Sequence, residues 1–150
     1  MDIVTTILEK SNHKYEFLFH EKQLYSAAEG ADYFGIEAGQ TAPTLIIKTE
    51  SSYYALTFSG SRKSIDLERL AVILGTSQVK LANKNKVREI TGFSPGDTPL
   101  VGLNLPSIFD KRLLQYPVIY GGSGQPNRTL KICPATLLQL IQPLAFLEID

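Results

Sequence analysis

Two glycine-containing loops are the best candidates for chemistry in this sequence. The first lies within residues 91–110, which have no helical period and contain three prolines and three glycines. Gly96, Thr98, Pro99 and Gly102 belong to a stiff turn there, because Pro99 fixes its own φ and restricts the residue before it. Backbone N–H groups in such a turn can bind a carbonyl oxygen, an oxyanion or a phosphate without any charged side chain. We call residues 96–102 the amide loop and predict that it binds such a group.

The second loop is Tyr-Gly-Gly-Ser-Gly at residues 120–124, after a short strand pattern. It has more glycine than a hairpin turn needs, so either a tight turn or close approach of a ligand to the backbone explains it. We predict that Gly121, Gly122 and Ser123 face the amide loop across one pocket. The rest of the chain then serves as the scaffold that brings the two loops together.

Conventional catalytic side chains are scarce. His13 lies in a predicted turn, whereas His20 ends a predicted strand, where it either lines the pocket or has a structural role. Cys133 precedes Pro134 at a predicted helix start, and we predict a small buried residue there because no histidine or acid accompanies it in sequence. Two histidines and one cysteine do not match a usual zinc site, so neither a metal nor a cofactor is expected.

A basic cluster is formed by Lys80, Lys84, Lys86 and Arg88, and the sequence has no acidic residue from position 77 to 87. Arg62 and Lys63 are predicted to join this cluster in space. A solvated helix face is the ordinary explanation, but a phosphate backbone also requires such a patch. Because 15 basic residues balance 15 acidic ones, any contact with nucleic acid must be local.

Length and composition indicate one cytoplasmic domain spanning residues 1–150. A chain of 150 residues with 43% hydrophobic and 20% charged residues can build one substantial core. The single cysteine excludes an internal disulfide and fits a reducing compartment. No apolar run approaches the roughly 20 residues that span a membrane, and the N-terminus lacks a signal-peptide pattern, so no membrane partner is expected.

Hydrophobic periodicity predicts interspersed helices and strands. Asp2, Ser26, Ser64 and Asn83 are the predicted helix N-caps. The predicted helices cover residues 2–10, 26–34, 64–74, 83–90 and 134–141, with a helical turn at 110–115. The predicted strands cover residues 14–20, 44–48, 53–58, 79–82, 118–120, 129–132 and 145–149. Since no regular βαβ repeat is present, we expect an α/β fold with a mixed sheet surrounded by helices.

The order of motifs resembles the YbaK/ProX family, the free-standing relatives of the prolyl-tRNA synthetase editing domain. The segments that carry the resemblance run over nearly the whole chain: residues 15–20, 25–28, 35–36, 44–47, 65–75, 81–82, 91–102, 120–124 and 130–132. The resemblance implies an α/β fold with a mixed, barrel-like central sheet and the activity of an aminoacyl-tRNA deacylase acting in trans. In the family, hydrolysis of the ester is thought to depend on the ribose 2′-hydroxyl of the substrate, a water molecule and the amides of a glycine–proline loop.

The resemblance also implies site residues and partners. His20, Tyr25 and Thr44 would line the substrate pocket, and the 3′ end of an aminoacyl-tRNA would be the main partner, with a synthetase as a further candidate. Two positions depart from the family pattern. Pro43 stands where the family's deacylases carry a lysine, and Leu100 stands at the expected loop proline. A non-catalytic tRNA- or oligonucleotide-binding module is therefore the alternative, and a small-molecule pocket unrelated to tRNA is a third.

Overall fold

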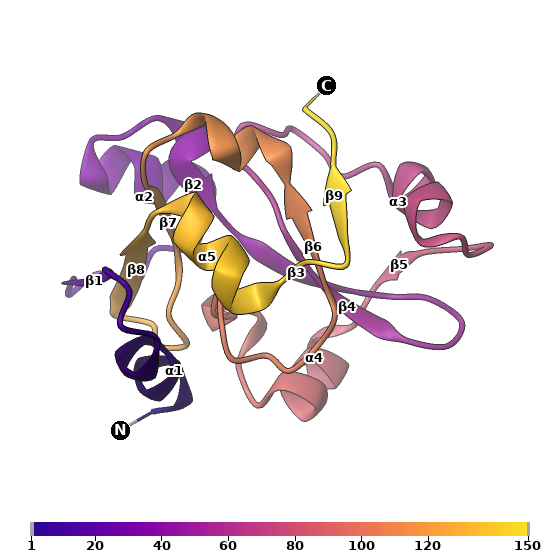
Figure 1. Ribbon diagram of the computed structural model, residues 1–150, viewed down its shortest axis with the longest axis horizontal. Coiled ribbons are helices and arrows are strands. Elements are labelled where there is room, and N and C mark those ends of the chain that lie inside the picture. Colours follow the sequence, from indigo (N-terminus) through magenta and orange to yellow (C-terminus); the bar gives the residue numbers. More distant parts are fainter. Residues whose placement is uncertain (1, 150) are drawn as a thin grey trace.

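Two mixed β-sheets organise the computed structural model, which describes residues 2–149 (Figure 1). The four-stranded sheet has the order β1 (Glu16–Phe19), β8 (Arg128–Ile132), β7 (Ile119–Gly122) and β2 (Thr41–Ala42). The five-stranded sheet has the order β5 (Lys80–Leu81), β3 (Thr44–Lys48), β4 (Tyr53–Thr57), β6 (Ser107–Asp110) and β9 (Ala145–Leu147). The pairs β2–β7, β4–β6 and β6–β9 are parallel, and the other pairs are antiparallel.

Pro43 marks the junction between the two sheets. It separates β2, which pairs with β7, from β3, which pairs with β4. Proline has no N–H to donate to a strand ladder, while its carbonyl still accepts from the N–H of Phe58 at 3.1 Å. The expected mixed α/β architecture is thus confirmed, and among residues 2–149 the strands form two joined sheets, not a closed barrel.

Helices cover the sheets, and most of their ends follow local sequence signals. The α-helices are α1 (Ile3–Ser11), α2 (Ala27–Phe34), α3 (Leu67–Leu74), α4 (Lys84–Thr91) and α5 (Pro134–Ile141), and the 3₁₀ helices are η1 (Ala38–Gln40), η2 (Pro95–Asp97) and η3 (Lys111–Gln115). Ser26 and Asn83 cap α2 and α4, as predicted. The prediction of Ser64 as a cap is wrong, because α3 starts later and Asp66 accepts the N–H of Arg69 at 3.1 Å.

The core lies on both faces of the five-stranded sheet. Ile47 packs in the cluster under α3, whereas its neighbour Ile46 packs with Val87 of α4 on the other face. This alternation places β3 between two layers, which explains its near-continuous apolar sequence. A third cluster joins the four-stranded sheet to α1, α5 and Phe109. Each fully buried side chain of this kind stabilises the fold by about 1.5–3 kcal/mol.

Residues 91–110 contain more regular structure than their sequence predicted. They include η2 and the strand β6, which lies between β4 and β9 in the five-stranded sheet. Ile108 and Phe109 are fully buried, in different clusters. A four-residue strand beside Pro106 is too short to give a clear alternating pattern, so it was missed. Within residues 2–149, no helix has the length and apolar character needed to cross a membrane.

Candidate functional site

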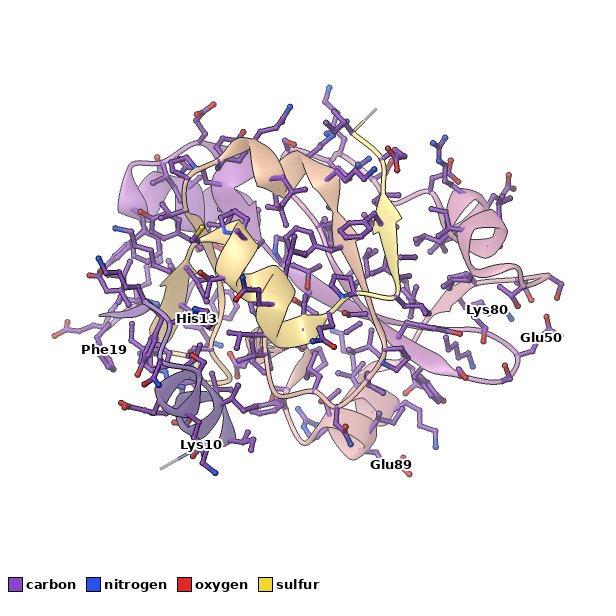
Figure 2. All side chains as sticks on the ribbon, in the orientation of Figure 1. Lys10, His13, Phe19, Glu50, Lys80 and Glu89 are labelled. Atoms are coloured by element: carbon purple, nitrogen blue, oxygen red, sulfur yellow. The ribbon has the colours of Figure 1, made fainter. Side chains whose placement is uncertain are left out.

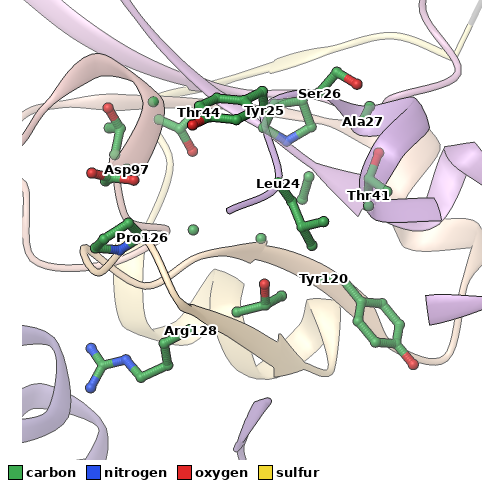
Figure 3. Close-up of a pocket in the computed structure, with 18 of the residues that line it drawn as sticks. Leu24, Tyr25, Ser26, Ala27, Thr41, Thr44, Asp97, Tyr120, Pro126 and Arg128 are labelled. Carbon is green, nitrogen blue, oxygen red and sulfur yellow. The ribbon is translucent and has the colours of Figure 1, made fainter. Parts of the chain in front are cut away.

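A cavity of about 290 Å³ lies where the two sheets join (Figure 3). Its walls come from the β2–β3 segment, the start of α2, the amide loop, and the strands β7 and β8. Of the predicted site residues, those that line it are His20, Tyr25, Thr44, Gly96, Thr98, Gly121 and Gly122. Segments far apart in the sequence therefore meet around one space, which both sheets border.

The two glycine loops are in direct contact. The N–H of Leu100 donates to the carbonyl of Gly122 at 3.0 Å. A Cβ placed on Gly122 would overlap the carbonyl oxygen of Thr98, and one placed on Gly121 would lie 2.6 Å from Cδ1 of Leu100 and 2.8 Å from the carbonyl oxygen of Ala42. Glycine is required here because neighbouring backbone occupies the space of a side chain.

Three other predicted residues lie outside this cavity. Gly102 has φ +94° and lies beside Ile3 and Ile7 of α1, in the wall of a second cavity of about 590 Å³. Pro99 is buried behind Gly122. Ser123 is 1% exposed, and its hydroxyl donates to the carbonyl of Arg128 at 2.6 Å. These residues shape the loops, while Gly96, Thr98, Gly121 and Gly122 border the cavity.

His20 lines the cavity with both ring nitrogens engaged. Its Nδ1 lies 2.7 Å from the carbonyl oxygen of Lys22, which can only accept, so Nδ1 carries a proton. Its Nε2 lies 3.0 Å from the hydroxyl of Thr129 and, in the neutral ring, accepts from it. Tyr33 and Phe34 approach the ring edge-on at 5.7 and 6.0 Å between centroids. His20 thus lines the pocket, and these contacts favour a structural role over a direct catalytic one, because both ring nitrogens are already hydrogen-bonded.

The β2–β3 segment supplies two wall residues of different character. Thr44 is buried, and its hydroxyl shares a hydrogen bond of 3.1 Å with the hydroxyl of Thr57. Pro43 lines the cavity directly, so a side chain at that position borders the space where substrate would lie. Tyr25 stands at the entrance with 76% of its surface exposed.

Asp97 lines the cavity and was not predicted as a site residue. It ends η2, directly after Gly96, and its Oδ1 accepts from Nε2 of Gln23 at 3.4 Å. Partial burial raises the pKa of Asp97, and the hydrogen bond from Gln23 opposes this rise. Asp97 lies inside the predicted amide loop, in which backbone N–H groups, and not this carboxylate, are expected to face a ligand.

The basic cluster divides in the structure. Arg88 donates to the hydroxyl of Ser94 at 3.3 Å, which places α4 next to the amide loop, and Lys80 is exposed on β5 (Figure 2). Lys84 is exposed, and Lys86 pairs with Glu89 at 3.3 Å.

Arg62 does not join this cluster. Its guanidinium binds the buried carboxylate of Asp110 through two contacts of 2.6 and 2.9 Å. The same guanidinium contacts the carbonyl of Glu148 near the C-terminal end of the chain, which Figure 1 draws on the opposite side of the molecule from α4. Lys63 is exposed beside Arg62 and is thus also separated from α4.

Cys133 corrects another expectation, because it is exposed and not buried. It occupies the N-cap position of α5 without a side-chain hydrogen bond to the helix. A residue before a helix-starting proline has to leave the helix path, and this turn places the thiol at the surface. Within residues 2–149, no group of three or more His, Cys, Asp or Glu side chains is arranged to hold a metal ion.

Comparison with known proteins identifies the family. The hypothetical protein APE2540 is similar at 26% identity and a TM-score of 0.89, with 97% of each chain covered. A proposed trans-editing enzyme for prolyl-tRNA synthetase is similar at 28% identity and a TM-score of 0.84, covering 97% of this chain and 96% of its own. A sequence model of the aminoacyl-tRNA editing domain matches residues 21–140. The chain therefore belongs to the aminoacyl-tRNA editing domain family.

Proposed function

We propose that this protein is a trans-acting aminoacyl-tRNA deacylase, which hydrolyses the ester between a wrong amino acid and the 3′ end of a tRNA. The observation that supports this most is the convergence of two glycine loops on one cavity. Gly96 and Thr98 border it from one side and Gly121 and Gly122 from the other. Membership of the editing family and the likeness to a proposed trans-editing enzyme support the same activity.

Backbone N–H groups would provide most of the catalytic stabilisation. An ester carbonyl placed against Gly96 and Thr98 would meet N–H groups whose positions are already fixed by η2 and Pro99. Preorganised donors stabilise a developing oxyanion because they need no reorganisation during the reaction. The ribose 2′-hydroxyl of the substrate lies next to the ester and can assist attack by water through proximity. His20 contributes shape to this site, since both its nitrogens are occupied.

Cavity size and lining favour a small amino acid. About 290 Å³ is at the low end of the range for ligand pockets, and part of that space must hold the terminal ribose. Leu24, Phe34 and Ala42 give part of the lining an apolar character. Alanine, serine and cysteine esters are therefore the first substrates to test.

The cluster on β5 and α4 would bind the acceptor stem. Lys80 and Lys84 are exposed, and Arg88 links α4 to the amide loop through Ser94. A tRNA with its 3′ end in the cavity would therefore bring stem phosphates close to these cations. Because one relative is described for prolyl-tRNA synthetase, tRNA for proline is the first tRNA to test, and that synthetase is the first candidate partner.

Release of labelled amino acid tests the proposal. The protein is incubated with tRNAs mischarged with alanine, serine or cysteine, and free label is measured against buffer alone. We expect turnover for at least one of these esters. Hydrolysis at the buffer rate across the whole panel would rule out the enzyme.

Pro43 supports a second candidate, a tRNA-binding module without hydrolytic activity. It borders the cavity at the position where the family's deacylases carry lysine. This candidate predicts tRNA binding that weakens with salt, without release of amino acid. A gain of hydrolysis in the variant Pro43→Lys would indicate an enzyme that lost its activity with the lysine. If the original protein is already highly active and the variant is no more active, lysine is not needed at this position. Pro43→Ala is the matched control for loss of the proline ring.

A further inference from the structure

The cavity contains a carboxylate that forms no ion pair within residues 2–149. Asp97 lines the cavity, and the ion pairs found among residues 2–149 lie elsewhere. Its polar partner is the neutral amide of Gln23, at 3.4 Å. Partial burial disfavours the charged form of this carboxylate, and a cationic group of a ligand would offset that cost.

The other charged residue that lines the cavity does not supply it. Arg128 pairs with Asp2 at 3.0 Å, and its guanidinium stacks 3.9 Å above the ring of Phe17. The same guanidinium donates to the carbonyl of Ser123 at 2.8 Å. Figure 3 shows it pointing away from the space between Asp97 and Tyr120. The side chain of Asp97 therefore gives the cavity a local negative charge.

We infer that Asp97 binds the protonated α-amino group of the aminoacyl ester and so restricts the site to substrates with a free amine. This inference rests on the proposed function and names a specificity-determining residue for it. In an aminoacyl ester the amino nitrogen is two bonds from the carbonyl carbon. A carbonyl held by the N–H of Gly96 would thus keep the ammonium close to the amide loop, where the carboxylate of Asp97 also lines the cavity.

The inference accounts for two properties of Asp97. Burial raises the pKa of its carboxyl group, an effect that a bound cation would reverse. The contact with Gln23 is long, so an ammonium can replace it with a shorter, charge-assisted hydrogen bond. A carboxylate at this place could instead activate the attacking water, and the two roles differ in how they depend on the substrate's amine.

Binding of stable analogues tests the inference without requiring hydrolysis. In 3′-alanylamino-3′-deoxyadenosine an amide replaces the ester, and its N-acetyl derivative lacks the ammonium. We expect calorimetry to show about tenfold tighter binding of the free amine, and Asp97→Asn to remove that preference. Asp32→Asn, which removes an exposed charge from α2, is the matched control and should keep the preference. Equal affinity for both analogues, no binding of either, or a preference that survives in Asp97→Asn would overturn the inference.

Hydrolysis distinguishes ammonium binding from water activation. Alanyl-tRNA and N-acetylalanyl-tRNA are compared, each rate being divided by the rate in buffer because the free amine itself activates the ester. For Asp97→Asn we expect kcat/KM to fall about tenfold for alanyl-tRNA and to change less than about twofold for the acetylated substrate. An equal loss for both would assign Asp97 to water activation and overturn the inference. If the original protein hydrolyses none of the alanine, serine and cysteine esters, the deacylase proposal fails, while the binding experiment still decides the role of Asp97.

Discussion

The backbone of Gly122 lies against the carbonyl oxygen of Thr98, so closely that a Cβ at position 122 would overlap that oxygen. The N–H of Leu100 donates to the carbonyl of Gly122 at 3.0 Å and joins the same two segments a second time. The distance between the two glycine loops is therefore set by main-chain contacts, which cannot rotate away as a side chain would. Substitutions at this contact should act on both the fold and the cavity.

Gly122→Ala should be destabilising, because the obstacle is fixed backbone and one of the loops has to move. We expect the free energy of unfolding to fall by about 1–3 kcal/mol and any deacylase activity to be lost. Gly96→Ala is the matched control for stability, since a Cβ there has no neighbour within 4 Å and its φ is not left-handed. Urea unfolding measures both variants. Equal losses of stability in Gly122→Ala and Gly96→Ala would show that the backbone contact at Gly122 does not restrict a side chain there.

Asp2 should make stability depend on acid pH. The hydrogen bond from Arg128 is the largest influence on this carboxylate, and the pKa of Asp2 is lowered from 3.8 to about 2. A group whose pKa is lower in the folded state stabilises the protein above its unfolded pKa, and this contribution is lost as pH falls through the folded pKa. Asp2→Asn keeps an N-cap for α1 but loses this charge.

The difference in unfolding free energy between the original protein and Asp2→Asn should therefore be greatest above about pH 4 and shrink towards about pH 2. Urea unfolding across this range measures it. A difference in unfolding free energy that stays constant with pH would show that the charge of Asp2 does not contribute to stability through Arg128.

Arg62→Ala should be among the most destabilising single changes in this chain. It would leave the fully buried carboxylate of Asp110 with the N–H groups of Ser59 and Arg112, at 2.8 and 2.9 Å, and no cation. Breaking a buried pair in this way costs about 3–5 kcal/mol. Lys63→Ala removes the neighbouring exposed charge and should change stability by less than about 0.5 kcal/mol. Thermal or urea unfolding compares the two, and similar losses would refute the importance of the pair.

Binding of tRNA should depend on salt through the cluster on β5 and α4. If Lys80 and Lys84 each contact a phosphate, replacing either by alanine should reduce the slope of log affinity against log salt by about 0.7–0.9. Lys10 is exposed on α1, and Figure 2 shows it on the other side of the molecule from Lys80, so Lys10→Ala is the control. Titrations at several salt concentrations measure the slope. An unchanged slope in both cluster variants would remove this surface from the proposed interface.

Helix ends were predictable because their signals are local. Ser26 and Asn83 accept N–H groups three residues ahead, and Gly75 and Gly92 close α3 and α4 with φ of +68° and +79°. Each of these features depends on a few neighbouring residues, which sequence displays directly. The meeting of the two glycine loops was expected from their glycine and proline content, and Gly96, Thr98, Gly121 and Gly122 line one cavity.

What the sequence did not predict depends on distant partners. The pairing of Arg62 with Asp110 joins positions 48 apart, so a cation assigned to a surface cluster is part of a buried ion pair. Residues 107–110 form strand β6 because they pair with β4 on one side and β9 on the other, and neither pairing is visible in the local sequence. The place of Asp97 in the cavity depends likewise on the fold around it, because a carboxylate in a loop is ordinarily solvated.

The passage of one backbone segment from the first sheet to the second at Pro43 has a consequence for how specificity can change. Main-chain hydrogen bonds hold this segment on both sides of Pro43, from the N–H of Phe58 to the carbonyl of Pro43 at 3.1 Å and from the N–H of Gly60 to the carbonyl of Thr41 at 2.9 Å. Behind the segment, one apolar cluster contains residues of both sheets. Phe109 and Leu113 belong to that cluster and do not line the cavity, so we expect substitutions there to change the shape of the cavity without a direct contact to a ligand. In a deacylase built this way, substitutions in the interior would alter substrate preference while every group proposed to meet the ester stays the same.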